Sequence, residues 1–163
     1  MYIDLTTMIK EGSFKSKTMN KLLSIIVCVL FVHAGIAAGD ISEKLLKTFA
    51  QTFPKAEQVK WVEQPDKYTV DFKDDGIPTK VEYDKDGNFV RSVRYYNGKQ
   101  LPVNIICKLE KKYPNKTVFG VTEMTTETDV EYYIKLEDAT TWMTVKSTAD
   151  GGMEVVEKYK KAA

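Results

Sequence analysis

The sequence predicts an α+β fold made of two tandem repeats, each a helix followed by four antiparallel strands. A helix-like apolar pattern that ends in an aromatic–proline pair occurs twice, sixty positions apart. Each occurrence is followed by strand-like alternation interrupted by Asp-Gly or Asn-Gly turns. A unit of about 60 residues would bury too little surface to be stable alone. We therefore place repeat 1 at 40–99 and repeat 2 at 100–163, within one compact domain.

Each predicted helix has five apolar residues, and the intervals between them are the same in both helices. This spacing places the five residues on one helical face. They are Ile41, Leu45, Leu46, Phe49 and Phe53 in the first helix, and Leu101, Ile105, Ile106, Leu109 and Tyr113 in the second. Asp40 is the expected cap of the first helix, with Glu43 completing a capping box. Pro102 suits the first turn of the second helix, where its missing N–H costs nothing. Pro54 and Pro114 are expected to end the helices, because the residue before a proline avoids α geometry.

Strands are predicted where apolar and polar residues alternate. Tyr68, Val70 and Phe72 share one face of a strand, and Tyr132, Ile134 and Leu136 repeat this pattern 64 positions later. Turns are expected at 74–76, 86–87, 97–98 and 150–151, where a glycine after Asp or Asn supplies a positive φ. The stretch "DKDGN" at 84–88 also resembles a calcium loop, but it lacks the distal glutamate of such loops, and a hairpin already explains it.

The N-terminal part of the chain has the pattern of a secretion signal. Lys21 precedes an apolar run from Leu22 to Val32, and the small residues of "AGIAAG" follow, so cleavage is expected after Ala37 or Gly39. A membrane anchor is the alternative, but the apolar run is only about half of the ~20 residues that span a bilayer. We predict a start at Met19, or an unusually long n-region. Residues 1–39 are thus an extension and signal peptide, and the mature protein is periplasmic or secreted without a membrane span.

The predicted mature chain lacks the residues of most catalytic and metal sites. It keeps 20 of 24 basic and 21 of 23 acidic residues, a net charge of −1, which argues against nucleic-acid binding. His33 and Cys28 lie in the signal, so no histidine remains, and Cys107 is the single cysteine. Histidine-based nucleophile activation, a Cys/His zinc site and an internal disulfide are therefore excluded. We predict no enzyme, no cofactor and no metal; a carboxylate pair such as Asp71 with Glu82 is the alternative, although surface charge explains both.

Four stretches carry a resemblance to a known family: "FPKAEQVKW", "VDFKDDGIPTKVEYDKDGNFV", "KKYPNKTV" and "YYIKLED". Over residues 41–160 the chain resembles the PepSY-like exported bacterial proteins, whose architecture is similar to that of the beta-lactamase inhibitor protein. This resemblance implies a curved antiparallel sheet with both helices on one face. The motifs specify a fold and no activity. The resemblance also implies an alternative function, inhibition of a periplasmic or secreted hydrolase of the peptidase or beta-lactamase type.

If the helices cover one face of the sheet, the strand residues that alternate with the predicted core residues point to the other face. Tyr133 then faces outward between Tyr132 and Ile134, and Trp142 faces outward because it is out of phase with Val145. In "NFVRSVRYY" we expect Phe89, Val93 and Tyr95 to face inward and Val90, Arg94 and Tyr96 to face outward.

The predicted partner-binding set is Trp142, Tyr133, Tyr96 and Arg94, because aromatic residues and arginine are typical of protein-binding hot spots. The expected partner is a protein or peptide in the cell envelope. Cross-strand pairing is an alternative reason for exposed aromatic residues on strands. If the alternation is assigned one residue off, all the assigned side chains change to the other face. Trp61 is expected in the core, and Cys107 as a partly buried thiol.

Overall fold

The computed structural model describes residues 41–162 of the 163-residue chain. The predicted signal peptide lies outside the described residues. The helices are α1 (Glu43–Thr52) and α2 (Val103–Lys112), with a short 3₁₀ helix, η2 (Gly98–Gln100), before α2. The strands are β1 (Glu57–Glu63), β2 (Lys67–Asp74), β3 (Ile77–Asp84), β4 (Phe89–Tyr96), β5 (Thr117–Thr126), β6 (Val130–Glu137), β7 (Thr141–Thr148) and β8 (Met153–Lys160).

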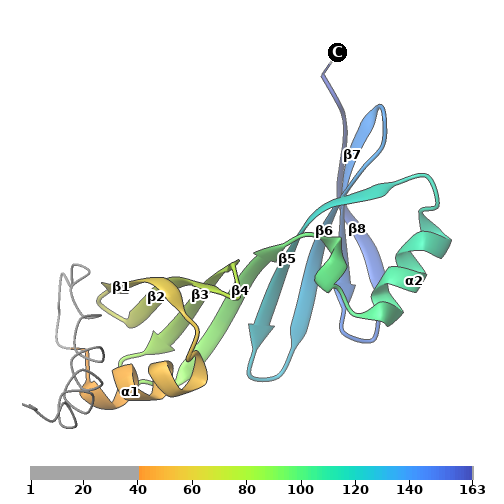
Figure 1. Ribbon diagram of the computed structural model, residues 1–163. Coiled ribbons are helices and arrows are strands. Elements are labelled where there is room, and N and C mark those ends of the chain that lie inside the picture. The colour runs from red at the N-terminus through yellow and green to blue at the C-terminus, as the bar shows by residue number, and fades with distance from the viewer. Residues whose placement is uncertain (1–40, 163) are drawn as a thin grey trace, which may run out of the picture. The chain divides into compact units, whose positions relative to one another are not determined.

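The strands form one eight-stranded antiparallel sheet in sequence order, β1 to β8 (Figure 1). Each strand pairs with the next along the chain, and β4 pairs with β5 across the connection that contains η2 and α2. The α+β class and the antiparallel sheet are confirmed. That the two helix-plus-four-strand halves are repeats of one unit stays a prediction.

Both helices pack on the same face of the sheet. Leu45 and Phe49 of α1 pack in one core cluster with Val70 and Val81 of β2 and β3. The strand register places Val81 opposite Ser92 and Ser92 opposite Thr125, so that face continues into β5. Val121, four residues before Thr125, lies on it too and packs in one cluster with Ile105 and Leu109 of α2. We call the opposite side the helix-free face, because no helix among residues 41–162 packs on it.

Each helix covers its own hydrophobic core. The first contains the buried residues Leu45, Phe49, Tyr68, Val70, Phe72, Val81 and Tyr83. The second contains Tyr96, Leu101, Ile105, Leu109, Val121, Tyr132, Ile134, Leu136, Met143 and Val145. Trp61 packs against the first core, as predicted, with its ring centroid 5.2 Å from that of Phe49.

The helix starts differ from the prediction at two points. The N-cap of α1 is Ser42, whose hydroxyl accepts a hydrogen bond from the Leu45 amide at 3.2 Å. Asp40, the predicted cap, lies outside the described residues, and the helix begins only at Glu43. Pro102 is the N-cap of α2 and lies directly before its first turn, not in it as predicted. The helices end at Thr52 and Lys112, two residues before the prolines, so the predicted stops are confirmed.

A β-bulge reverses the predicted facing of β4. Tyr83 pairs with Phe89 but Glu82 pairs with Arg91, which leaves Val90 as an extra residue. Beyond it, Arg94 and Tyr96 share the helix-covered face, whereas Val93 and Tyr95 lie on the helix-free face. The predicted outward facing of Arg94 and Tyr96, and the inward facing of Val93 and Tyr95, are therefore wrong.

Arg94 and Tyr96 instead form a polar group with Glu123 of β5 on the helix-covered face. The Tyr96 hydroxyl donates to Glu123 Oε2 at 2.6 Å, and Arg94 Nη1 lies 3.4 Å from Glu123 Oε1. Burial, together with the hydrogen bond to Glu123, raises the pKa of the Tyr96 phenol far above its ordinary value. Tyr96 is 9% exposed and belongs to the second core, so its role is structural.

Cys107 is exposed on α2, not partly buried as predicted. The residues of α2 that face the sheet are Ile105 and Leu109. Position 107 lies about 200° around the helix from each of these two positions, which turns the thiol toward solvent.

Candidate binding surface on the helix-free face

Aromatic side chains and lysines gather on the helix-free face of β4–β8. We call the following set the aromatic–lysine surface: Tyr95, Phe119, Tyr133, Lys135, Trp142, Lys146, Tyr159 and Lys161. The register places Tyr95, Thr122, Tyr133 and Lys146 in one row across four strands. A second row joins Glu137, Trp142 and Tyr159. Phe119, Tyr95 and Tyr159 are 60%, 50% and 41% exposed, so their rings are accessible to a partner.

Trp142 is the centre of contacts within this surface. The Phe119 ring meets it edge-on, with the ring centroids 4.9 Å apart. The ammonium groups of Lys135 and Lys161 lie 4.9 and 4.4 Å from the centroid of the Trp142 ring system. Lys135 also lies 5.7 Å from the Tyr159 ring centroid. These cation–π contacts hold positive charge directly beside apolar rings.

Tyr133 is held by a carboxylate on the same face. Its hydroxyl donates to Glu131 Oε2 at 3.1 Å, and Lys146 Nζ lies 2.7 Å from Glu131 Oε1. The hydrogen bond from Lys146 lowers the pKa of Glu131, and the same contact raises the pKa of Lys146. Glu131 and Lys146 therefore neutralise each other, whereas Lys135 has no ion pair among residues 41–162.

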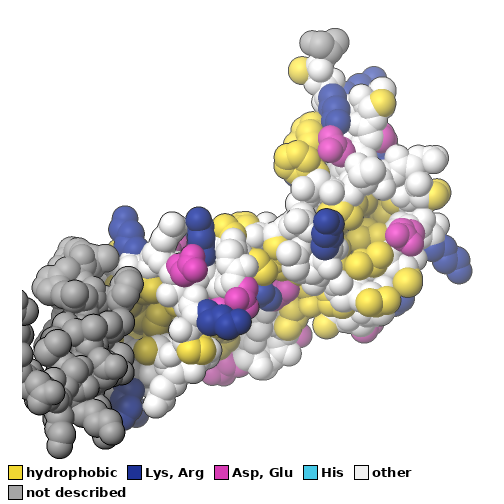
Figure 2. Space-filling model, in the orientation of Figure 1, with side chains coloured by type: hydrophobic (Ala, Val, Ile, Leu, Met, Phe, Trp, Pro, Cys, Tyr) yellow, Lys and Arg dark blue, Asp and Glu magenta, His cyan; other side chains and the backbone are white. Residues whose placement is uncertain are grey.

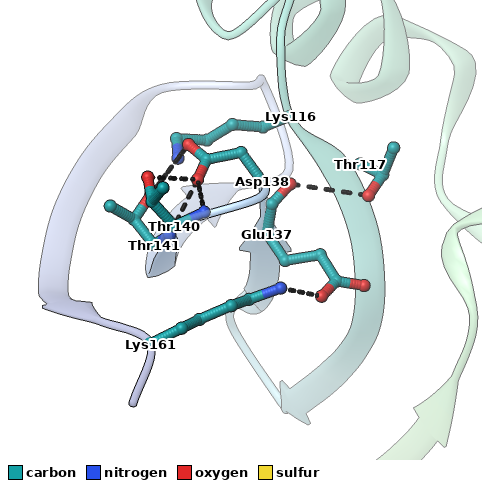
Figure 3. A network of polar contacts seen from close by, with 7 residues as sticks. All are labelled: Lys116, Thr117, Glu137, Asp138, Thr140, Thr141 and Lys161. Carbon is teal, nitrogen blue, oxygen red and sulfur yellow. Dashed lines mark hydrogen bonds and ion pairs between the residues drawn. The ribbon is translucent and has the colours of Figure 1, made fainter. Parts of the chain in front are cut away.

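A polar network fixes the end of the surface near Lys161 (Figure 3). Asp138, after β6, accepts from the backbone amides of Thr140 and Thr141 at 2.9 and 2.7 Å, and it also pairs with Lys116. The hydrogen bond from Lys116 is the main cause that holds the pKa of Asp138 far below its ordinary value. Lys161 donates from Nζ to Glu137 at 2.6 Å and from its amide to the Thr140 carbonyl at 2.8 Å, which keeps its ammonium over Trp142.

A shallow hollow of about 350 Å³ lies within the surface. It is lined by Tyr95, Phe119, Gly120, Tyr133 and Lys135 among others. The pairing of β5 with β6 shifts between Val118 and Gly120, so Phe119 is a bulge residue. Gly120 presents no side chain to the hollow, and the displaced Phe119 ring forms one of its walls.

The structure brings two of the four predicted site residues together on the helix-free face. Trp142 and Tyr133 lie there, and Arg94 and Tyr96 do not. Sequence reasoning missed Phe119, Tyr159 and Tyr95 as members of the surface. The Phe-Gly pair at 119–120 is the signal that could have indicated the β5 bulge, since an isolated glycine in a strand often marks one.

The two carboxylates considered for catalysis lie elsewhere on the helix-free face. Glu82 is 7% exposed and pairs with Lys67 at 2.9 Å and with Arg91 at 2.8 Å. The hydrogen bond from Arg91 is the main cause that lowers the pKa of Glu82. Asp71 pairs with Lys80 at 3.3 Å. Within residues 41–162 no group of His, Cys, Asp and Glu has the arrangement of a metal site.

The fold belongs to an architectural class in which one open antiparallel sheet carries its helices on a single face. Comparison with solved structures defines this class as BLIP-like. A BLIP-like protein from Bacteroides fragilis matches with a TM-score of 0.57 and 19% identity, over 76% of this chain and 89% of that one.

Two further Bacteroides structures have the same fold. A DUF2874 family protein from Bacteroides uniformis has a TM-score of 0.55 and 18% identity, over 74% of this chain and 89% of that one. A protein from Bacteroides eggerthii, described as periplasmic, has a TM-score of 0.55 and 17% identity, over 75% and 90%. At this identity the likeness shows the fold alone. No family model matches the sequence, and no curated protein does.

Proposed function

We propose that this chain is a non-enzymatic exported module that binds a protein or peptide through the aromatic–lysine surface. The observation that carries the proposal is the cluster around Trp142, where exposed rings lie beside ammonium groups on a face without a described helix. Trp and Tyr are enriched among the few residues that supply most of the binding energy at protein interfaces.

Export is supported by the predicted signal at 19–39 and by the Bacteroides eggerthii neighbour, which is described as periplasmic. No helix among residues 41–162 is long and apolar enough to cross a membrane. The PepSY-like relationship is part of this proposal and rests on the sequence motifs.

The absence of enzyme activity is also a proposal. The surroundings of Glu82 support it, because this carboxylate is 7% exposed and is bound by both Lys67 and Arg91, which leaves it poorly placed to reach a substrate. Its two ion pairs give Glu82 a structural role instead.

The experiment compares cross-linking capture from the cell-envelope fraction by the wild-type protein and by two variants. Trp142→Ala is expected to reduce recovery of the same specific partner at least tenfold, as is typical of a hot-spot aromatic. Val103→Ala is the matched control, because Val103 is an exposed apolar residue on α2, away from the surface. Equal recovery by wild type and Trp142→Ala would contradict the proposal.

Inhibition of a periplasmic or secreted hydrolase is the second candidate, favoured by the likeness to a BLIP-like structure. Under this candidate the protein inhibits a peptidase or a beta-lactamase. The inhibition should be weaker with Trp142→Ala and unchanged with Val103→Ala. A panel of such hydrolases that keeps full activity at micromolar concentrations of the protein would remove this candidate.

A further inference from the structure

Lys135 differs from the two other lysines of the aromatic–lysine surface, because its ammonium has no carboxylate partner. Lys146 lies 2.7 Å from a Glu131 oxygen, and Lys161 lies 2.6 Å from a Glu137 oxygen. Both of these charges are therefore neutralised within the face. Lys135 forms no ion pair in the described part of the chain, so its positive charge stays available to a partner.

The Lys135 ammonium lies against aromatic rings, 4.9 Å from the centroid of the Trp142 ring system and 5.7 Å from that of Tyr159. Its side chain is half-buried. Glu157 lies two strands away in the same row of the sheet, and its carboxylate accepts from the Thr144 hydroxyl at 3.3 Å, not from Lys135. Because rings displace water from around the ammonium, a carboxylate that arrives there meets a less screened charge.

One row across β5, β6 and β7 forms the floor of the shallow hollow. The register places three residues in that row: Gly120, Lys135 and Thr144. All three line the hollow of about 350 Å³. Rings lie on both sides of the row, those of Tyr95 and Tyr133 on one side and that of Phe119 on the other. Since glycine has no side chain and threonine has a short one, space remains between these rings for an apolar side chain of a partner.

The surface thus offers two kinds of contact next to each other. The hollow offers rings to an apolar side chain, and the Lys135 ammonium beside Trp142 offers a charge to an anion. Hydrophobic side chains also lie beside acidic and basic ones near β7, the strand that carries Trp142 (Figure 2). A partner that matched only the rings would leave this cation without a counterion at the interface, which costs free energy once water is excluded.

We propose that the partner presents an aspartate or glutamate next to a large apolar side chain on one exposed peptide segment. The carboxylate binds the Lys135 ammonium, and the apolar side chain lies in the hollow between Phe119 and Tyr133. Charge complementarity selects this occupant, because rings alone accept any apolar group, whereas an unpaired ammonium favours an anion and disfavours a cation. The inference rests on the proposed function and specifies which chemistry the same surface recognises.

The test begins with a selection from random peptides displayed within a phage coat protein, with the full chain as the target. Internal display removes free C-termini, so every carboxylate comes from a side chain. Wild type is expected to enrich peptides with Asp or Glu next to a large apolar residue, and Trp142→Ala should not enrich them. Lys135→Met should keep the apolar preference and lose the acidic one, whereas Lys135→Arg should keep both.

The most enriched peptide is then synthesised with both ends capped, once as selected and once with its acidic residue replaced by the corresponding amide. Fluorescence anisotropy gives the Kd of each form. The amide form should bind wild type about tenfold more weakly, the usual effect of losing a charge-assisted hydrogen bond. Lys135→Met should weaken the acidic form by the same factor and leave the amide form unchanged, which assigns the loss to this pair.

Lys80→Met is the matched control, because it removes the same charge from the helix-free face of β3, where Lys80 pairs with Asp71. Both peptides should bind this variant as they bind wild type. Circular dichroism checks that each variant folds, and Lys135→Gln takes the place of Lys135→Met if the methionine variant does not fold.

Two results would overturn this inference and leave the proposed function intact: enriched peptides that need Trp142 but have no acidic preference, or an acidic preference that persists without the Lys135 ammonium. A selection that yields no peptide dependent on Trp142 would overturn both. Dimers of the full chain that dissociate in Lys135→Met, measured by sedimentation, would assign the site to a second copy and also overturn the inference.

Discussion

Glu82 accepts two charge-assisted hydrogen bonds at a buried position, from Lys67 and Arg91. We expect Glu82→Gln to lower the free energy of unfolding at neutral pH by about 1–3 kcal/mol, since it leaves both cations without their carboxylate. Asp71→Asn is the matched control, because Asp71 forms one half-exposed ion pair with Lys80 on the same face. It should cost less than about 1 kcal/mol. Urea unfolding of both variants measures the difference.

The pH dependence of this contribution follows from the lowered pKa of Glu82. The ordinary pKa of the carboxyl is 4.5, and the folded value lies below it, mainly because of the hydrogen bond from Arg91. The stabilisation is therefore fully present above pH 4.5 and is lost as the pH falls through the folded pKa. The difference between wild type and Glu82→Gln should shrink in urea titrations at successively lower pH. If the difference in unfolding free energy between wild type and Glu82→Gln stays constant as the pH falls well below 4.5, the stabilisation does not come from the ionised carboxylate.

At the scale of single elements, α1 depends on a cap that α2 does not have. Ser42 accepts the hydrogen bond that satisfies the Leu45 amide, whereas Pro102 offers α2 no side-chain cap. Ser42→Ala should destabilise the protein by about 1 kcal/mol, and Ser42→Thr should keep most of the stability. Thermal unfolding followed by circular dichroism measures both. Equal midpoints for Ser42→Ala and wild type would show that the cap contributes nothing.

The positions of both helices could be predicted from the sequence, but the facing of β4 could not. Hydrophobic periodicity and prolines were sufficient for both helices, because these signals are local. The facing of β4 was not predictable in this way, since the extra residue at Val90 is visible only in the pairing with β3. A one-residue shift moves every later side chain to the other face. The prediction therefore assigned Arg94 and Tyr96 to the wrong face. It assigned Trp142 and Tyr133 to the correct face, because no bulge precedes these residues on their strands.

The aromatic–lysine surface was only partly predictable for a related reason. Seven of its eight members come from β4 to β8 and meet through strand pairing, which a single sequence does not state; Lys161 directly follows β8. Phe119 joins the surface through the bulge in β5. Lys161 joins it because the Glu137 carboxylate and the Thr140 carbonyl hold it over Trp142, contacts that depend on the tertiary fold.

At the scale of the described sheet, the two cores are separate clusters joined by the backbone ladder of β4 and β5. The ladder begins at the pair Arg91–Thr126 and ends at the pair Tyr96–Val121, and its register does not shift between them. Tyr96 belongs to β4 and yet packs in the second core, so β4 contributes to both halves. Disruption of one half should therefore remove support from the other, and we expect residues 41–162 to unfold in one cooperative transition.

The two tryptophans allow this expectation to be measured half by half. Trp61 packs on the first core and Trp142 lies over the second half, and the chain has no other tryptophan. Trp142→Phe leaves a fluorescent reporter of the first half, and Trp61→Phe leaves one of the second. Within each variant, the urea midpoint from fluorescence should equal the midpoint from circular dichroism, which reports the whole sheet. A fluorescence midpoint that precedes the circular dichroism midpoint in either variant would mean that this half unfolds independently. The β4–β5 ladder would then connect two domains instead of coupling two parts of one.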